Sequence, residues 1–259
     1  MKIEIEKKVG FYEVDSDFTL RFKSLSHFFQ DATGAHSDWG GCGIRWLMGQ
    51  GKAWVLYRTC IRAYRMPCLG DDLKILTWSR GGKGYRAHRD FEVLCKGEKI
   101  VSATSLWLFI DIENKKILKV PGEAAQWYTV ETDQTLDMDI DGFQPNLKFD
   151  FELSETAEIR PSDLDPLCHV NNALYLDFLE NLVHRAFNGK KKIQEVVIQF
   201  HNEIPKEVGR VEIGIRQKDG LNEFKIISPG CVHAAGTFQF FDFREPGPAA
   251  GQGYSLNEP

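Results

Sequence analysis

One short stretch of the chain places side chains suited to acid–base chemistry directly before an apolar helix pattern. Residues 163–180 read DLDPLCHVNNALYLDFLE, so two carboxylates, an imidazole and two amides precede the apolar run. The N-terminal end of a helix exposes free N–H groups and a partial positive charge. Such groups stabilise the oxyanion that forms when a carbonyl is attacked, and a carboxylate beside them can act as base or nucleophile. The stretch therefore predicts a site for attack on a carbonyl carbon.

Each polar residue of this stretch has a predicted role and a simpler alternative. Asp165 is the predicted general base or nucleophile, and His169 would donate to it or shuttle a proton. Backbone N–H groups near His169 and Val170 would hold the carbonyl oxygen. The alternative for the Asp is helix capping. For Asn171 and Asn172, both predicted to bind substrate, the alternative is hydrogen bonding to neighbouring backbone.

Two similar halves are predicted to carry this stretch. Residues 25–40 and 169–187 have helical spacing, and Gly189 is a suitable stop for the second helix. Four strand-like runs follow each helix: 54–65, 71–80, 85–95 and 101–112, then 195–204, 209–218, 221–228 and 232–243. A strand-like lead-in, 18–25 or 149–160, precedes each helix. The pattern β-α-β-β-β-β therefore occurs twice.

A long apolar helix followed by a four-stranded meander suggests a sheet wrapped around a buried helix. The predicted fold is α+β, a tandem (double) hotdog, and the alternative is an unrelated pair of domains with accidental similarity. Matching strand counts favour duplication. We expect an N-terminal hotdog domain at 1–140, a C-terminal one with the catalytic motif at 141–245, and a disordered tail at 246–259, rich in Pro and Gly.

Composition narrows the class of protein. The 259 residues are 42% hydrophobic and 27% charged, which is typical of a globular chain with a real core. The net charge of −5 argues against a nucleic-acid binder. The six cysteines have no paired spacing, which favours reduced thiols over a metal or disulfide framework. Without an apolar leader or an apolar run long enough to span a membrane, the expected location is the cytoplasm.

Several segments, in order along the chain, resemble the acyl-acyl carrier protein (acyl-ACP) thioesterase family. SDLDPLCHVNNALYLDFLEN resembles that family's SDLDxNxHVNNxxYxxWxLE stretch. FFQDATGAHSDWG resembles its first helix, and WVLYRTCIRAYRMPCLGDDLKILTW its WVxxRxxVxxxxxPxxGDxxxxxTW. GKGYRAHRDFEV and SATSLWLFIDIENKKILKVP match further segments, so the similarity covers about residues 10–245. The resemblance implies a double hotdog that hydrolyses fatty acyl-ACP, ending chain elongation in fatty acid biosynthesis, with no cofactor and no metal.

The family's catalytic residues transfer to this chain with one departure. Its Asp falls on Asp165, its His on His169 and its Glu on Glu203. Its catalytic Asn falls on Leu167, which has neither donor nor acceptor, so Asn171 or a backbone amide would have to take that role or the activity is altered. The Cys that follows the Glu in plant members is Ile204 here, which excludes a thiol nucleophile at that place.

The implied partner is acyl carrier protein, an acidic protein that needs a locally basic surface. The candidates, for each of which the alternative is an ordinary solvated charge, are Arg80, Lys83, Arg86, Arg89, Lys190, Lys191 and Lys192. Tryptophans of the first half, Trp54 among them, would set the depth of an acyl tunnel. The first half shows neither a DxD before its helix nor HVNN, so one active site per chain is expected. The oligomeric state stays open, with a homodimer as one option.

Other functions stay open at this point. An acyl-CoA thioesterase of the hotdog superfamily would use the same Asp and helix terminus. DLDPLCH also resembles the DxNPxH signature of hotdog hydratases, with one residue inserted. The loss of the Asn is compatible with a non-catalytic acyl-binding module. Cys168 is a further candidate nucleophile, although a lone Cys beside a His more often packs locally.

Overall fold

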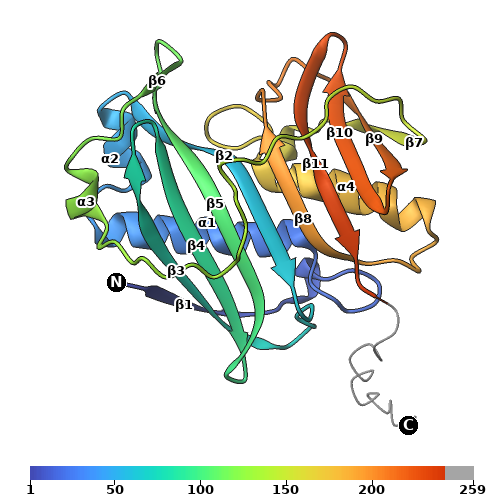
Figure 1. Ribbon diagram of the computed structural model, residues 1–259, viewed down its shortest axis with the longest axis horizontal. Helices are drawn as coiled ribbons and strands as arrows, with labels where there is room; N and C mark the ends of the chain where they lie inside the picture. Colours follow the sequence, from blue (N-terminus) through green and yellow to red (C-terminus); the bar gives the residue numbers. More distant parts are fainter. Residues whose placement is uncertain (243–259) are drawn as a thin grey trace.

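A single antiparallel sheet with two long helices on one face forms the molecule (Figure 1). The structure is a computed structural model that describes residues 1–242. The predicted tail, 246–259, lies outside the described residues. No helix within the described part is both long and apolar enough to cross a membrane. All six cysteines are free thiols.

The two halves contain matching elements. The first half consists of β1 (Ile3–Lys8), α1 (Phe22–Trp39), α2 (Ile44–Gly49), β2 (Lys52–Ala63), β3 (Asp72–Lys83), β4 (Arg86–Cys95), β5 (Glu98–Asp111), β6 (Lys116–Leu118) and α3 (Ala124–Trp127). The second half consists of β7 (Leu153–Glu158), α4 (Asn172–Ala186), β8 (Ile193–Phe200), β9 (Arg210–Lys218), β10 (Leu221–Ser228) and β11 (Cys231–Phe240). All eight predicted meander strands are confirmed, with ends shifted by a few residues.

The strand order shows that the halves are related by an approximate two-fold rotation about the centre of the sheet. The order β1-β3-β4-β5-β2 continues directly into β8-β11-β10-β9-β7, so each half follows the same path outward from the centre. Antiparallel pairing of β2 with β8 joins the halves, with Thr59 opposite Ile198. The tandem hotdog prediction is therefore confirmed. The domain limits at 140 and 141 stay a prediction, and they fall within the connection between α3 and β7.

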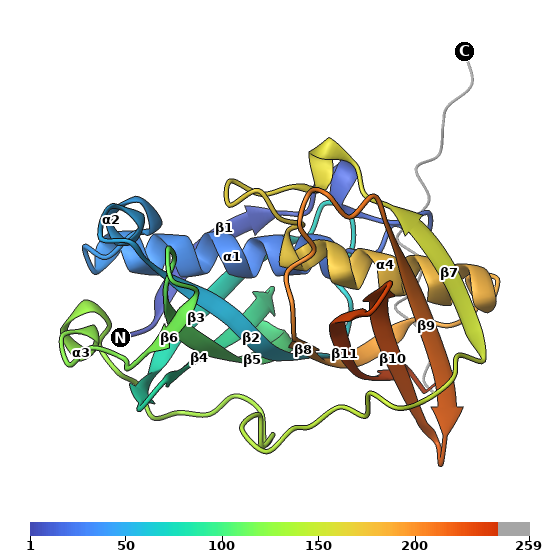
Figure 2. The ribbon, with the colours of Figure 1, turned by 90° about the horizontal axis from the view of Figure 1, so that it is seen from above.

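Both long helices cover the same face of the sheet, one over each half (Figure 2). Their buried residues recur every three to four positions, as in Leu25, Phe28 and Phe29 of α1. Leu179 and Leu182 repeat the pattern on α4. Burying one such side chain stabilises the fold by about 1.5–3 kcal/mol relative to leaving it in water. This apolar spacing presses each helix onto its half of the sheet.

The connection between the halves crosses the opposite face of the sheet (Figure 2). Its side chains Leu136 and Ile140 are buried against Cys60 of β2 in a small second core. Arg58 of the same strand donates from Nη1 to the Ile140 carbonyl at 2.9 Å. The connection therefore covers the sheet where its two halves meet.

The predicted lead-in strand 18–25 is wrong. The edge strand is β1, and α1 already begins at Phe22. The intervening chain reverses because the Asp15 carboxylate accepts the N–H groups of Asp17 at 2.9 Å and Thr19 at 3.1 Å. Phe18 in this turn has a φ of 60°. Local side-chain to backbone bonds therefore outweigh the strand-like spacing.

That turn has a counterpart before the second helix. The 3₁₀ turns η1 (Phe11–Glu13) and η2 (Pro161–Asp163) precede the helices, and each position of the second lies 150 residues after its counterpart in the first. Cys168 repeats the left-handed φ of the first turn at 64°. Asp15 thus occupies the place that Asp165 has in the second half. The statement that the first half lacks the motif is correct for HVNN and wrong for the carboxylates.

Candidate active site

Asp163 supports the turn that precedes α4. Its carboxylate accepts the Arg160 N–H at 2.9 Å and the guanidinium of the same residue at 2.9 Å. Its carbonyl accepts the N–H of Asn171 at 3.0 Å. With a side chain only 3% exposed, Asp163 caps the turn.

Asp165 is held in one orientation and faces an imidazole. Its Oδ1 accepts the N–H of Leu167 at 2.8 Å, and its own N–H donates to the His169 carbonyl at 2.9 Å. Its Oδ2 lies 3.3 Å from Nδ1 of His169, which also faces the Val170 carbonyl oxygen at 3.3 Å. Because both neighbours of Nδ1 are acceptors, the proton of the neutral ring belongs on Nδ1, and Nε2 keeps its lone pair.

In the structure, the backbone N–H group that is free to polarise a substrate carbonyl is that of Asn172, and not that of Val170. The N–H of Val170 donates to the Ile204 carbonyl at 2.9 Å, and the Val170 side chain is buried in the core. The expected substrate contact of Val170 is therefore replaced by a structural one. The N–H of Asn172, the first residue of α4, donates to no group of the described residues. It is the free N–H group at the helix start.

Asn171 is the N-cap of α4 and links the two halves. Its Oδ1 accepts the Ala173 N–H at 2.9 Å. The same oxygen accepts from Nε2 of Gln30 at 3.1 Å, and its Nδ2 donates to the Gln30 Oε1 at 3.3 Å. This contact holds the start of α4 against the middle of α1. Gln30 could not be predicted as a site residue, because its partner lies 141 residues away along the chain.

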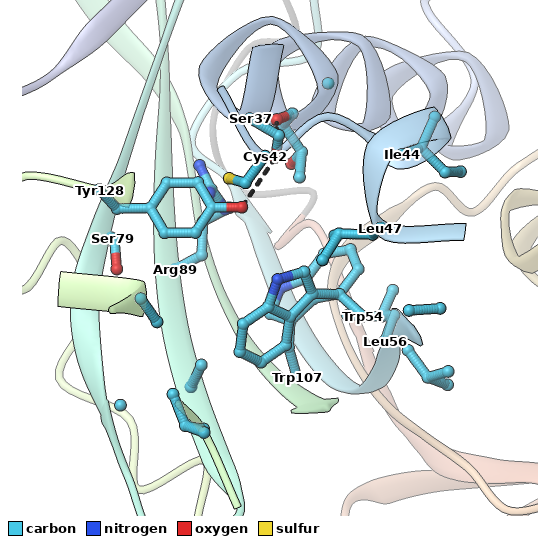
Figure 3. A pocket seen from close by; sticks show the side chains of 18 of the residues that line it. Ser37, Cys42, Ile44, Leu47, Trp54, Leu56, Ser79, Arg89, Trp107 and Tyr128 are labelled. Carbon is cyan, nitrogen blue, oxygen red and sulfur yellow. Dashed lines mark hydrogen bonds between the residues drawn. The ribbon is translucent and has the colours of Figure 1, made fainter. Parts of the chain in front are cut away.

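A cavity of about 860 Å³ opens at this turn and extends into the first half. Figure 3 shows the part that lies in the first half. Its walls come from α1, α2, the sheet strands β2 to β5 and the chain around α3. Asp165, His169, Asn171 and Asn172 line it from the second half, and Trp54 lines it from β2. The structure thus gathers five of the seven predicted site residues around one space, of a size typical of small-molecule pockets.

Glu203 lies apart from the cavity wall. Its carboxylate pairs with Lys115 at 2.6 Å, and 47% of its side chain is exposed. Burial foremost, with the charges of Glu203 and Asp165 adding to it, raises the pKa of Tyr175. The Tyr175 hydroxyl accepts the Ile204 N–H at 3.2 Å, so the two carboxylates flank one buried phenol.

The predicted basic surface is partly wrong. Arg80, Lys83 and Arg89 line the cavity, and Arg89 is only 6% exposed. Lys192 is paired with Asp15 and with Asp17 at 2.7 Å. Strand alternation turns half of a strand's residues inward, so neighbouring charges in the sequence do not form one surface.

Leu167 and Cys168 have different positions in the turn. Leu167 lines the cavity beside Asp165, so an apolar side chain occupies the place of the family's Asn. Cys168 is exposed and is not part of the cavity wall. Within residues 1–242, no group of three or more His, Cys, Asp or Glu side chains is placed to hold a metal ion.

Fold and site together define a double-hotdog protein in which a polar turn of one half opens into a cavity of the other. Models of the acyl-ACP thioesterase N-terminal and C-terminal domains match residues 2–128 and 148–228. The chain therefore belongs to the acyl-ACP thioesterase family.

Known proteins agree with this assignment. The crystal structure of a putative oleoyl thioesterase from Lactobacillus plantarum has a TM-score of 0.81 at 20% identity, covering 93% of this chain and 96% of that one. The 12:0-ACP thioesterase from Umbellularia californica has a TM-score of 0.79 at 18% identity, covering 92% and 96%. At these identities the likeness shows the fold.

Curated relatives are matched over part of their length. The acyl-[acyl-carrier-protein] hydrolase FATB3, chloroplastic, of Cuphea viscosissima is 24% identical over 209 residues, covering 74% of this chain and 49% of the relative. The oleoyl-acyl carrier protein thioesterase 1, chloroplastic, of Arabidopsis thaliana is 24% identical over 217 residues, covering 74% and 58%. The chain thus spans about half the length of the curated relatives it matches.

Proposed function

We propose that this protein hydrolyses the thioester of fatty acyl-ACP to free fatty acid and carrier protein. The observation that carries the proposal is that Asp165 and His169 of one half face a cavity enclosed by the other half. The cavity offers an acyl chain an enclosed space, and the pair at its mouth supplies a base. The names of the relatives, acyl-ACP hydrolases and thioesterases, support the same reaction.

In the proposed mechanism a water molecule attacks the thioester carbon. The Asp165 carboxylate keeps the proton of His169 on Nδ1, so that Nε2 takes a proton from the water as its oxygen bonds to carbon. The carbonyl oxygen becomes an oxyanion, and the N–H of Asn172 at the start of α4 donates to it. When the carbon–sulfur bond breaks, the sulfur of the carrier leaves and takes the proton from Nε2.

The other predicted residues have supporting roles in this proposal. Asn171 keeps the helix start in place, and Trp54 forms part of the wall along the acyl chain. Glu203 stays a predicted catalytic residue, and it would have to release Lys115 to reach the site. The role in ending chain elongation, the homodimer and the cytoplasmic location stay predictions, and the plant relatives are named chloroplastic.

Leu167 decides how the mechanism departs from the family pattern. A leucine cannot orient a water or a carbonyl, so the turn offers backbone N–H groups in place of a side-chain amide. The Leu167 N–H is already bound to Asp165. We therefore expect Leu167→Asn to change turnover less than any substitution of Asp165.

The test is the release of free thiol from a panel of acyl-ACP and acyl-CoA thioesters, with the wild type beside Asp165→Ala. We expect hydrolysis of acyl-ACP that is lost in the variant, while the far-ultraviolet circular dichroism stays unchanged. Asp15→Ala, which removes the matching carboxylate of the first half, is the control.

Each alternative gives a distinct result in this experiment. Faster turnover of acyl-CoA than of acyl-ACP would assign the protein to the other carrier. Hydration of an enoyl thioester without thiol release would indicate a hydratase. Tight binding of acyl-ACP without any product would indicate a binding module and would contradict the proposal.

A further inference from the structure

The acidic and the basic side chains of the cavity wall come from different halves of the molecule. The one carboxylate of the wall is Asp165, at the turn before α4. The three formal cations of the wall, Arg80, Lys83 and Arg89, lie on β3 and β4 of the first half. Arg80 is paired with the buried Asp90 at 3.5 Å and Lys83 is exposed, so Arg89 is the cation that an apolar acyl chain leaves unexplained.

The helix α1 shows where Arg89 lies relative to the turn. Gln30 contacts the start of α4 through Asn171, whereas His36 contacts Arg89. Six residues of helix separate Gln30 from His36, which corresponds to about 9 Å along the helix axis. Arg89 is therefore deeper in the first half than the polar turn, on the side where α1 reaches α2 (Figure 2).

Arg89 is a buried cation whose neighbours are neutral. Its Nη1 lies 2.9 Å from Nδ1 of His36 and donates to Oγ1 of Thr77 at 3.1 Å. Its guanidinium carbon lies 5.1 Å from the centre of the Tyr128 ring. Burial raises the pKa of Tyr128 to about 12, and burial lowers that of Arg89 to about 10, so at neutral pH only the arginine is charged. The neighbouring Asp90 is paired with Arg80, and no carboxylate of the described residues forms an ion pair with Arg89; an unpaired buried charge is costly.

The donors of this region also lack acceptors. Burial and the neighbouring Arg89 lower the pKa of His36 to about 4, so the ring is neutral. Because its Nδ1 faces an N–H of Arg89, its proton is on Nε2, and this buried atom has no partner. On the cavity wall itself, Nε1 of Trp54 is a second buried donor without a hydrogen-bond partner in residues 1–242, whereas Nη1 of Arg80 lies 3.5 Å from the buried Asp90 carboxylate. Buried polar atoms are normally satisfied, so the donors of His36 and Trp54 await an acceptor.

The opposite wall is apolar. Figure 3 shows Tyr128 and Arg89 on one side of the cavity, across from Leu47, Trp54 and Trp107. Methylene groups can pack against the leucine and the tryptophans while the end of the chain meets the donors. A guanidinium matches a carboxylate in both charge and geometry.

We propose that the acyl group of the preferred substrate carries a carboxylate at the end remote from the thioester, and that Arg89 binds it. This inference rests on the proposed function, since it names the substrate class of the same site. The substrate is then the half-thioester of a dicarboxylic acid with the carrier protein. Hydrolysis at Asp165 would release the free diacid.

The experiment compares paired ACP thioesters of equal carbon number, one ending in a methyl group and one in a carboxylate, over a series of chain lengths. For the wild type we expect kcat/KM to favour the carboxylate by at least about tenfold at the best length. Arg89→Met should abolish this preference, and Arg89→Lys should keep part of it, because the charge remains and the planar fork is lost. Arg86→Met is the matched control on the same strand, since Arg86 is half exposed and pairs with Asp141. The control is read only as the ratio between paired substrates, in which any change in carrier binding cancels, and this ratio should equal that of the wild type.

Each result separates this inference from the proposed function. The wild-type ratio is decisive without any variant, so a poorly folded Arg89→Met would not block the test. Equal or faster hydrolysis of the methyl-ended chain would overturn the inference and leave the thioesterase function intact. An unchanged preference in folded Arg89→Met would remove Arg89 from recognition. No hydrolysis of either series at any length would overturn the proposed function itself.

Discussion

The first half of the molecule is hollow and the second is filled, although five strands follow the same order in each. On α1 the wall of the cavity is made by the small residues Thr33, Gly34 and Ser37. At the positions 150 residues later stand larger residues: the buried Val183 and the exposed His184 of α4, and Phe187, the half-buried C-cap of that helix. Phe187 packs edge-on against Phe240, with ring centroids 5.3 Å apart. Val183 and Phe187 thus pack into the core at positions where the first half has a small wall residue of the cavity.

The two turns before the helices differ in their partners more than in their backbone. Asp15 and Asp165 each accept the N–H two residues later, at 2.9 and 2.8 Å. Beside Asp165 lies an imidazole, whereas the Asp15 carboxylate is paired with Lys192. Because an ammonium neutralises Asp15, we infer that the duplicated turn kept its shape and lost its chemistry.

A third difference lies on the helices themselves. Gln30 of α1 binds the N-cap of α4, and Glu180 of α4 accepts the N–H of Phe22 at the start of α1, at 2.9 Å. The same cross-contact therefore has a neutral amide at the candidate active site and a carboxylic acid at the other end. A second carboxylate beside Asp165 would compete with it for protons, and the amide avoids this.

The largest expected effect is the difference in kcat between substitutions of Asp165 and of Asp15. Asp165→Asn should lower kcat for acyl-ACP by about 10²–10⁴-fold, the contribution of a positioned acid or base, since the amide cannot orient the imidazole in the same way. Asp15→Asn should leave kcat within about twofold, because no catalytic pair faces it. Thiol release at saturating substrate measures both. Equal losses in the two variants would show that the turns act only as structural supports.

The second effect concerns the hollow of the first half. Ser37→Phe places in α1 the side chain that the C-cap of α4, Phe187, has at the matching position, and it should fill the inner part of the cavity. We expect kcat/KM for the longest accepted chain to fall by at least about tenfold relative to the shortest, because pocket contacts discriminate chain lengths on this scale. Comparing turnover over a series of chain lengths measures it.

The matched control is Phe187→Ala in the filled half. Removing the half-buried ring should lower the free energy of unfolding by about 2 kcal/mol and leave the chain-length profile unchanged. A changed profile in this variant would mean that the second half also contacts the acyl chain. Urea unfolding and the same substrate series give both numbers.

Sequence reasoning predicted the strands and the polar turn more reliably than the environment of the site. Alternating apolar residues mark each strand of a half-buried sheet, which is why the eight meander strands were found. Gln30, Arg89 and Tyr128 were missed as site residues because their roles depend on contacts made after folding, such as the contact of Arg89 with His36. The Glu13-Val14-Asp15 segment could have been found, since it stands before α1 as Asp163-Leu164-Asp165 stands before α4.

The third prediction concerns Glu180 of α4, whose carboxylic acid accepts the N–H of Phe22 at the start of α1. Burial foremost raises the pKa of Glu180 to about 8 from the ordinary 4.5, so the folded state retains a proton that the unfolded chain releases above pH 4.5. Its contribution to stability is therefore fully present below pH 4.5 and is lost as the pH rises to about 8. Glu180→Gln keeps the acceptor oxygen and stays neutral, so it should raise the free energy of unfolding by about 2 kcal/mol at pH 8 and hardly at pH 4.5.

Urea unfolding of wild type and variant at both pH values measures this difference. Gln30→Glu, which places a carboxylic acid at the matching position of α1, is the reciprocal control. The free energy of unfolding of this variant should fall with rising pH relative to the wild type. A Glu180→Gln effect of the same size at both pH values would show that packing, not ionisation, separates the two residues.

The smallest effect concerns the ion pair in the turn of the first half. Burial tends to raise the pKa of Asp15, but Lys192 and the N–H groups of Asp17 and Thr19 outweigh it and hold the pKa below the usual 3.8. The stabilisation is thus present above pH 3.8 and is lost as the pH falls through the lowered pKa. Lys192→Met should lower the free energy of unfolding by about 0.5–1 kcal/mol at pH 7, and by less near pH 3, since the pair is partly exposed to solvent.

Urea unfolding at the two pH values measures the loss, and turnover of acyl-ACP should stay within about twofold. A large gain or loss of turnover in Lys192→Met would mean that the first turn still takes part in the reaction, and the separation of the halves into a supporting turn and a reacting one would then be wrong.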